Sequence, residues 1–285
     1  MKVLVTGATG QVGGAVLKSA PAGFNVLGCS RAECDMSDEY SVRSAICSYR
    51  PQIVVNAAAY TAVDRAEEEE PLAMAVNANS VAVIADELKQ YGGRLVHLST
   101  DFVFDGTSPR AYTPCDPVRP LSAYGRSKVA GEYAAGADSL IIRTSWVYAA
   151  GGANFVNTML KLMRQRDELR VVADQIGSPT WAAALAQILW GLVISKATGI
   201  YHHRDAGVAS WYDFAVAIQE EAYSLGMLDK QITILPISTE QYPTPATRPR
   251  FSLLDDQNTR ALLGDQAAHW RVNLRKMLVE EKSIF

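Results

Sequence analysis

The chain has 285 residues, 48% of them hydrophobic and 20% charged, and its net charge of −3 at pH 7 leaves no electrostatic footprint for nucleic acid. No apolar run reaches the roughly 20 residues that a membrane span needs, and the apolar stretch at residues 3–5 is too short for a signal-peptide core. We therefore expect a cytoplasmic protein with neither nucleic acid nor membrane as a partner.

Short apolar runs rich in β-forming residues alternate with longer stretches in the first half of the chain. The predicted strands are residues 2–6, 24–29, 52–57, 94–100 and 139–145. The predicted helices are residues 11–20 and 38–49, followed by one or two helices within 67–91. This alternation is typical of a parallel sheet with helices on both faces, so the sequence predicts a doubly wound α/β fold.

The alternation relaxes after residue 146. Helices are expected at residues 154–166, 181–195 and 211–225, and a strand at 170–173. The segment Gln241–Arg250 contains too many prolines for a helix or a central strand and predicts an ordered loop. We divide the chain into a dinucleotide-binding domain, residues 1–146, and a smaller, mainly substrate-binding region, residues 147–285, with some segments returning to the sheet.

Three glycines, Gly7, Gly10 and Gly13, lie between the first predicted strand and the first predicted helix. They permit a tight turn and let backbone N–H groups at the helix start face a pyrophosphate. The spacing Gly-x-x-Gly-x-x-Gly resembles that of the short-chain dehydrogenase/reductase class, and a structural turn without a ligand is the alternative. The small residues Ala57–Ala59 after the third strand indicate a cofactor wall or, alternatively, tight helix–sheet packing.

The end of the second predicted strand indicates the choice of cofactor. NAD-preferring enzymes commonly carry an acidic residue there, whereas an arginine accommodates the 2′-phosphate of NADP. This chain has Ser30 and Arg31 there, with no carboxylate before Glu33. A guanidinium and a hydroxyl suit a phosphate, so we predict a preference for NADPH. The alternative is that Arg31 caps a surface turn and that NADH is used as well.

Tyr124 and Lys128 are four residues apart and therefore share one face of a helix. An ammonium beside a phenol favours the ionised form, so we expect Lys128 to lower the pKa of Tyr124 from about 10 toward neutrality. Thr100 ends the fourth predicted strand and offers a hydroxyl to a substrate carbonyl, although a helix cap is the alternative. Together with the glycine turn after the first strand, these three residues predict a nicotinamide-dependent carbonyl or alcohol enzyme.

Six segments, spread over nearly the whole chain, resemble the dTDP-4-dehydrorhamnose reductase family. They are Gly7–Gly13, Asn56–Asp64, Ser99–Gly106, Tyr124–Glu132, Arg143–Tyr148 and Tyr242–Pro249. The third and the last are the most specific. The resemblance implies a Rossmann-type sheet and an NADPH-dependent reduction of the 4-keto group of dTDP-4-dehydro-L-rhamnose to dTDP-L-rhamnose, a step that supplies cell-surface polysaccharide.

The resemblance also implies roles for individual residues. It implies a catalytic set of Thr100, Tyr124 and Lys128. The implied sugar contacts are Val63, Asp101, Phe102 and Trp146, although a core aromatic is the alternative for Trp146. The predicted cofactor contacts are Gly7, Gly10, Gln11, Val12, Gly13, Ser30, Arg31, Asp35, Met36, Ala57, Ala58, Ala59, Tyr124 and Lys128.

Two positions depart from the family pattern. Phe102 stands where many relatives carry tyrosine, which keeps an aromatic wall but removes a hydroxyl. Some relatives bind magnesium at a dimer contact through a first-helix glutamate, and Ala15 replaces it here. The four cysteines and four histidines also form no ligand pattern. We expect no metal site, and any homodimer would form without a bridging metal.

Two other functions stay open at this stage. A nucleotide-sugar 4,6-dehydratase or epimerase shares the glycine turn and the Tyr/Lys pair, but dehydratases usually carry an Asp-Glu pair after the threonine, where this chain has Asp101 and Phe102. A non-catalytic subunit resembling the methionine adenosyltransferase beta subunit would keep the fold without turnover. All three catalytic candidates are present, which favours the reductase.

Overall fold

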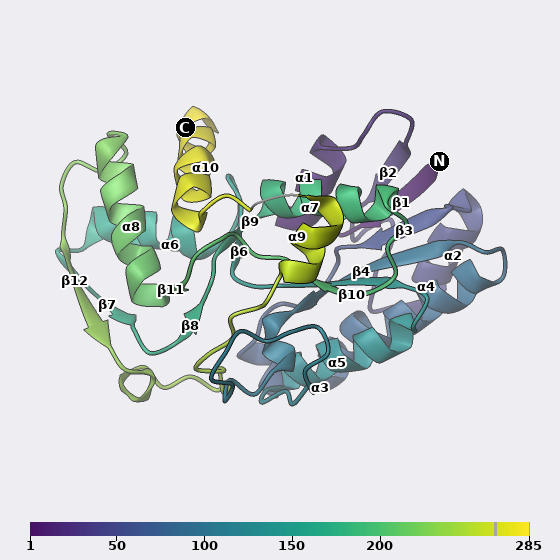
Figure 1. Ribbon diagram of the computed structural model, residues 1–285, viewed down its shortest axis with the longest axis horizontal. Coiled ribbons are helices and arrows are strands. Elements are labelled where there is room, and N and C mark those ends of the chain that lie inside the picture. Colours follow the sequence, from purple (N-terminus) through teal and green to yellow (C-terminus); the bar gives the residue numbers. More distant parts are fainter. Residues whose placement is uncertain (265–266, 285) are drawn as a thin grey trace.

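The computed structural model of the protein describes residues 1–264 and 267–284 and has two lobes. A six-stranded parallel sheet forms the centre of the larger lobe (Figure 1). The strand order is β10-β5-β4-β3-β1-β2. The strands are β1 (Lys2–Thr6), β2 (Asn25–Cys29), β3 (Ile53–Asn56), β4 (Arg94–Thr100), β5 (Leu140–Thr144) and β10 (Gly199–His202). The five strands expected in the first half of the chain are all present, and the predicted doubly wound α/β fold is confirmed.

Every residue of β3 and of β5 is buried, as expected of parallel strands covered on both faces. The helices on one face are α1 (Gln11–Lys18) and α7 (Ala182–Ile194), which contact each other and share one core cluster with the sheet. The helices on the other face include α2 (Glu39–Tyr49), α4 (Ser80–Lys89) and α5 (Ala123–Ala135). The two layers leave the carboxyl ends of the strands as the open edge.

The chain reverses its winding direction between β1 and β3. From β1 it runs outward to β2, then returns across β1 to β3 and continues through β4 and β5. A ligand in an open parallel sheet binds at such a switch point, outside the carboxyl ends of the strands. Gly7 follows β1 and Ala57 follows β3, so these predicted cofactor contacts lie at the switch point.

The connection from β3 to β4 contains an irregular helical segment. Helix α3 (Glu70–Met74) passes into a π-helical turn, η2 (Ala75–Asn79), and then into α4. The sequence predicted one or two helices here without this turn. Single π turns inside helices are rare and occur frequently at functional sites.

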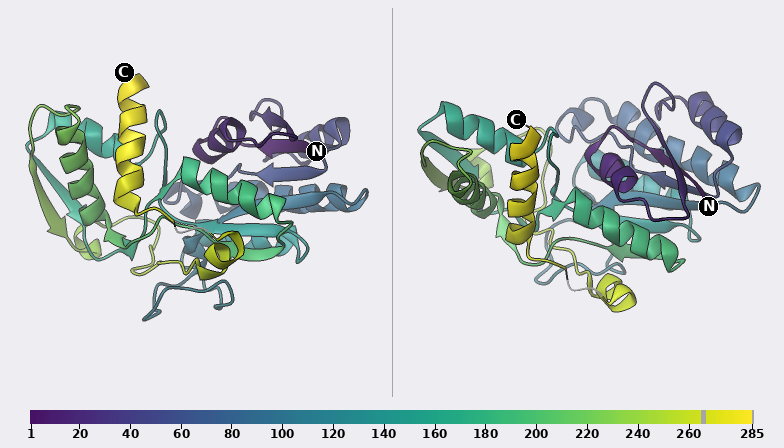
Figure 2. Two further views of the ribbon diagram at one scale, coloured as in Figure 1. Left: turned by 45° about the horizontal axis from the view of Figure 1, so that its top comes forward. Right: turned by 90° about the horizontal axis from the view of Figure 1, so that it is seen from above.

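A smaller lobe lies beside the strand ends of the sheet (Figures 1 and 2). Its helices are α6 (Phe155–Gln165), α8 (Trp211–Ser224) and α10 (Trp270–Ile284), and its parallel strand pair is β7 (Glu168–Val172) with β12 (Thr233–Ile237). They share a separate hydrophobic core that includes Phe214 and Leu274. Helix α7 and strand β10 come from the same half of the sequence but pack in the larger lobe.

Short strand pairs and a loop connect the lobes. The strands are β6 (Val147–Tyr148) with β9 (Thr180–Trp181), and β8 (Ile176–Gly177) with β11 (Ala209–Ser210). The segment predicted as a proline-rich loop follows η4 (Thr239–Gln241) and contains no further helix or strand up to residue 250. No helix in residues 1–264 or 267–284 has both the length and the apolar character to cross a membrane.

Candidate active site

The glycine turn after β1 is packed too closely to admit side chains. Gly7 has a φ of 66°, and a Cβ added there would lie 2.7 Å from the backbone of Ala58. A Cβ at Gly13 would lie 2.2 Å from the carbonyl oxygen of Gly7. Gly10 precedes α1 and provides no side-chain cap, so no capping side chain covers the first amides of the helix, at Gln11 and Val12. The turn therefore fits the backbone-bound diphosphate of a dinucleotide.

The same contact involves the alanines after β3. A Cβ added at Gly7 would meet backbone atoms of Ala57 and Ala58, so any side chain at Gly7 would push the two strand ends apart. Ala57, Ala58 and Ala59 are all partly exposed at this edge of the sheet. Ala58 also packs against the core cluster between the sheet and helices α2 and α4, as the packing alternative expects, and the partial exposure of the run leaves it accessible to a ligand.

The residues that follow β2 are the most exposed part of the predicted cofactor site. The Arg31 side chain is 79% exposed, and its Nε lies 3.4 Å from Asp35 Oδ2. Glu33 folds back so that both the backbone N–H and the hydroxyl of Ser30 donate to Glu33 Oε2, each at 2.8 Å. A carboxylate thus lies beside Ser30. The sequence, which has no acidic residue at positions 30–32, had predicted no negative charge there. Met36 is buried in the core, so its side chain is directed away from solvent.

Thr100, Asp101 and Tyr124 meet at the carboxyl end of β4. The Thr100 hydroxyl donates to Asp101 Oδ1 at 3.0 Å, and it lies within hydrogen-bond reach of the Tyr124 phenol. Thr100 also accepts the Phe102 N–H at 3.2 Å, capping the 3₁₀ turn η3 (Asp101–Val103). The capping alternative for Thr100 and its predicted position beside Tyr124 therefore both hold.

The expected lowering of the Tyr124 pKa is wrong in direction. Burial raises the pKa of Tyr124 to about 12, the hydrogen bond from Thr100 opposes this rise, and the negative charge of Asp101 adds to it. Lys128 shares the helix face as predicted, but its Nζ donates to the Leu98 carbonyl at 2.7 Å. The phenol is therefore held in its neutral, proton-donating form at neutral pH.

Lys128 is itself almost fully buried. Burial lowers the pKa of its ammonium to about 8, while the carboxylate of Glu132, one helical turn further along α5, raises it. Glu132 is held by Arg143 of β5, whose Nε and Nη2 donate at 2.8 and 2.6 Å, and by the Ser99 hydroxyl at 2.5 Å. A buried charged network thus lies directly behind the three predicted catalytic residues.

Asp101 is a second buried ionisable group at this edge. Burial raises its pKa to about 6, whereas the hydrogen bond from Thr100 to Oδ1 opposes that rise. Its Oδ2 atom is buried and has no hydrogen-bond partner among the residues that the structure describes. An unpaired carboxylate oxygen of this kind is costly and needs an explanation, which a bound polar group would supply.

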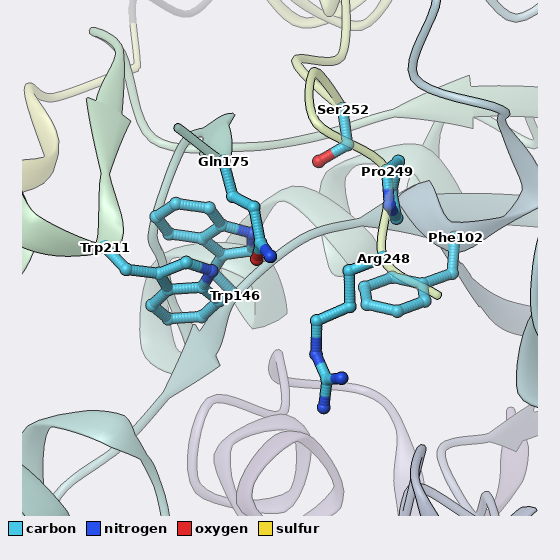
Figure 3. A pocket seen from close by; sticks show the side chains of 7 residues that line it. All are labelled: Phe102, Trp146, Gln175, Trp211, Arg248, Pro249 and Ser252. Carbon is cyan, nitrogen blue, oxygen red and sulfur yellow. The ribbon is translucent and has the colours of Figure 1, made fainter. Parts of the chain in front are cut away.

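A pocket opens next to these residues, between the lobes (Figure 3). It is lined by Phe102, Trp146, Gln175, Trp211, Arg248, Pro249 and Ser252. Phe102 packs edge-on against Tyr124, with ring centroids 5.6 Å apart, and Val63 packs against the same small cluster. The structure thus brings the four predicted sugar contacts, Val63, Asp101, Phe102 and Trp146, to the pocket or directly beside it.

Arg248, one of the pocket residues, makes an ion pair with the larger lobe. Its Nη1 and Nη2 donate to the two carboxylate oxygens of Asp64 at 3.0 and 2.7 Å, and its Nη1 also donates to Thr244 and to the Ala246 carbonyl. Asp64 belongs to the segment after β3, whereas Arg248 belongs to the proline-rich loop. The ion pair therefore fixes this loop against the larger lobe.

Sequence reasoning missed several residues of the site. Gln175, Trp211 and Ser252 line the pocket but belong to no local motif. Asn77, in the π turn, donates to Ser127 Oγ and to the Tyr60 carbonyl and accepts the Tyr60 N–H, at 2.9, 3.1 and 2.9 Å. It thereby ties the loop after β3 to the helix of Tyr124. A π turn leaves no recognisable signal in a single sequence.

Metal ligands do not gather in the described parts of the chain, residues 1–264 and 267–284. No three histidine, cysteine, aspartate or glutamate side chains there lie close enough together to hold a metal ion. All four cysteines are free thiols.

The amino-acid sequence is similar to that of known proteins over nearly its whole length. Residues 1–283 match the family described as RmlD substrate binding domain. A spore coat polysaccharide biosynthesis protein, SpsK of Bacillus subtilis, is 43% identical over 99% of this chain and 98% of its own length. A dTDP-4-dehydrorhamnose reductase of Burkholderia thailandensis is 41% identical, over 95% of this chain and 96% of its own.

A solved structure agrees with these sequence matches. The dTDP-4-dehydrorhamnose reductase of Bacillus anthracis, crystallised in complex with NADP, superposes with a TM-score of 0.91 at 34% identity, covering 98% of this chain and 99% of that one. The fold and the Thr/Tyr/Lys arrangement define a nicotinamide-dependent reductase of the short-chain dehydrogenase/reductase type. Within that class, the chain belongs to the dTDP-4-dehydrorhamnose reductase family.

Proposed function

We propose that this protein reduces the 4-keto group of dTDP-4-dehydro-L-rhamnose with NADPH and releases dTDP-L-rhamnose. The observation that carries the proposal is the position of Thr100 beside Tyr124 at the end of β4, next to a pocket that takes its walls from both lobes. Lys128 lies one helical turn further along α5, with its Nζ on the Leu98 carbonyl of the same strand. The names of the similar reductases, at about 40% identity over nearly the full chain, supply the substrate.

The residues at the end of β4 suit the proton transfer. NADPH, when bound, supplies a hydride to C4 of the sugar. Tyr124 donates its phenolic proton to the C4 oxygen as the carbonyl becomes an alcohol, and its raised pKa, to about 12 through burial, keeps that proton in place at neutral pH. Thr100 turns its single hydroxyl proton from Asp101 Oδ1 to the same oxygen when the sugar binds. The Lys128 ammonium, one helical turn from Tyr124 on α5, favours the phenolate that remains, although burial outweighs this effect on the pKa of the free phenol.

The residues at the ends of β1, β2 and β3 suit the cofactor. The glycine turn and the first amides of α1 would hold the diphosphate, and the alanine run would lie against the dinucleotide. Arg31 would contact the 2′-phosphate, and Asp35 and Met36 would lie near the adenine. The backbone of Met36 would make its contact, because the side chain is buried.

This proposal assigns dinucleotide binding to residues 1–146 and substrate binding mainly to residues 147–285. The pocket supports that division, because Phe102 and Trp146 lie in the first segment, whereas Gln175, Trp211 and Arg248 lie in the second. Free thiols at all four cysteines suit the reducing cytoplasm, where we place the protein. A homodimer stays a prediction from the family resemblance.

The decisive experiment offers the purified protein dTDP-4-dehydro-L-rhamnose and NADPH. We expect one NADPH to be oxidised for each dTDP-L-rhamnose formed, with the product identified by NMR. UDP- and GDP-linked 4-keto-6-deoxysugars serve as nucleotide controls. Loss of water or a change of sugar stereochemistry without net NADPH oxidation would identify a dehydratase or an epimerase. Cofactor binding without any turnover would favour the regulatory-subunit alternative.

A further inference from the structure

Trp146 has an unusual backbone conformation for a bulky residue. Its φ is 48°, in the left-handed region that large side chains rarely adopt. It follows β5 by two residues and lines the pocket between the lobes. Backbone strain of this kind persists only where the surroundings hold it, and it concentrates at ligand sites. The contacts that hold Trp146 in this conformation therefore also fix one wall of the pocket.

Two residues of the second half of the chain contact the indole of Trp146. The ring of Trp211 stacks on it, with centroids 3.7 Å apart and planes inclined by 10° (Figure 3). Gly177 of β8 lies so close that an added Cβ would come within 3.0 Å of Trp146 Cε2. The Trp146 carbonyl accepts the N–H of Thr180 at 3.2 Å. The ring is thus supported by an aromatic face and a glycine backbone.

Trp211 is in turn held firmly within the smaller lobe. It is the first residue of α8, directly after Ser210, whose side chain and backbone form a reciprocal capping box with Asp213. The ring of Phe155, from α6, packs against Trp211 with centroids 4.7 Å apart. The Trp146–Trp211 stack therefore joins the strand ends of the larger lobe to the helices of the smaller one.

We propose that Trp211 is a positioning residue for the sugar subsite, which holds the strained Trp146 ring in place and so sets the affinity for the keto sugar. This inference rests on the proposed function. Figure 3 shows Arg248 and Phe102 across the pocket from the two stacked rings. A shift of Trp146 would change the width of the pocket on the side opposite Phe102, the residue that contacts Tyr124. The cofactor contacts predicted at β1 and β2 would not move.

The test compares Trp211→Leu, which removes the stack, with Trp211→Phe, which keeps an aromatic face. Gly177→Ala is an independent variant, because its new methyl group would press on the Trp146 ring while leaving both indoles present. Trp181→Phe is the control, since it removes a tryptophan of the same lobe that does not line the pocket. Far-ultraviolet circular dichroism reports the stack directly, because two stacked indoles give an exciton couplet.

For Trp211→Leu we expect loss of the couplet and a roughly three- to tenfold rise in KM for the keto sugar, with KM for NADPH unchanged. Trp211→Phe should regain much of the sugar affinity, and Gly177→Ala should raise the same KM while it keeps a couplet. Trp181→Phe should match the unmodified protein in couplet and sugar KM.

The outcomes separate this inference from the proposed function. A folded Trp211→Leu or Gly177→Ala protein with unchanged sugar KM would overturn the role of Trp211. An unmodified protein that shows the couplet but oxidises no NADPH with the keto sugar would overturn the proposed function instead.

Discussion

The two ends of the candidate site differ in how strongly they are exposed to water. At the end of β2, Arg31 is 79% exposed and Glu33 lies at the surface beside Ser30. At the end of β4, Lys128 and Asp101 are only 2% and 1% exposed, and burial shifts the pKa of each. Water screens charges at the first end, whereas at the second end each charge is held by a few specific partners. We therefore expect substitutions at the buried end to change the chemistry and those at the exposed end to change only affinity.

The largest effect is expected for Tyr124→Phe. It removes the proposed proton donor and little volume, so kcat should fall by a factor of roughly 10² or more. The melting temperature and the affinity for NADPH should stay close to those of the unmodified protein. Tyr133→Phe, at a 75% exposed position of the same helix, is the matched control and should leave kcat unchanged. Normal turnover by folded Tyr124→Phe would refute the assignment.

The buried end should also determine the pH dependence. The pKa of Lys128, lowered by burial to about 8, means that the ammonium loses its charge as the pH rises through this value. Since the charged form is the one that stabilises the phenolate, kcat should decline above pH 8. Control by Tyr124 alone would place the decline near 12, the value to which burial raises its pKa. A kcat profile that is flat to pH 10 would contradict the role of Lys128.

Glu132→Gln sharpens this test. The Glu132 carboxylate raises the pKa of Lys128, so its removal should move the decline in kcat to lower pH. The change also leaves Arg143 unpaired in the interior, at a cost of roughly 3–5 kcal/mol, so rates should be measured well below the melting temperature. Ser99→Ala removes a hydrogen bond to the same carboxylate but not its charge, and it should leave the pH of the decline in place.

The same contrast explains what the sequence could predict. Buried parallel strands such as β3 and β5 are continuous apolar runs, so a local pattern located them. Strand β12 was missed because it contains Pro236 and belongs to an exposed two-stranded sheet with β7. Helix α10 was missed although its buried residues Trp270, Leu274, Met277 and Leu278 have helical spacing. Local pattern therefore predicted the larger lobe better than the smaller one.

For the site, the sequence predicted which residues meet but not their surroundings. Thr100, Tyr124 and Lys128 came from motif and spacing. The direction of the Tyr124 pKa shift depends on burial and on the bond from Lys128 to the Leu98 carbonyl, which spacing does not contain. Gln175, Trp211 and Ser252 reach the pocket from distant parts of the chain. Only tertiary structure shows that they line one pocket.

At the exposed end, Arg31→Ala should have a moderate effect. The guanidinium is solvated, so we expect the preference for NADPH over NADH to shrink by about tenfold, mostly in KM, as for the loss of one charge-assisted contact. The kcat with NADPH should change little, because the chemistry takes place at the other end. Arg43→Ala is a control with an arginine on α2 that pairs with Glu87. Equal kcat/KM for the two cofactors in the unmodified protein would show that Arg31 does not recognise the phosphate.

The smallest effect is expected for Glu33→Gln, and it should have the opposite sign. Glu33 accepts both Ser30 donors and places a negative charge beside the proposed 2′-phosphate site. The hydrogen bonds from Ser30 hold the pKa of Glu33 below its usual value, so the carboxylate is ionised at neutral pH. Glutamine keeps an acceptor for the Ser30 N–H but removes the repulsion. KM for NADPH should therefore fall by roughly two- to fivefold, with KM for NADH unchanged.

Because surface charges are screened by ions, the difference in KM for NADPH between Glu33→Gln and the unmodified protein should diminish at high salt. A rise in KM for NADPH would show instead that Glu33 is needed to hold Ser30 and the turn in place for the cofactor.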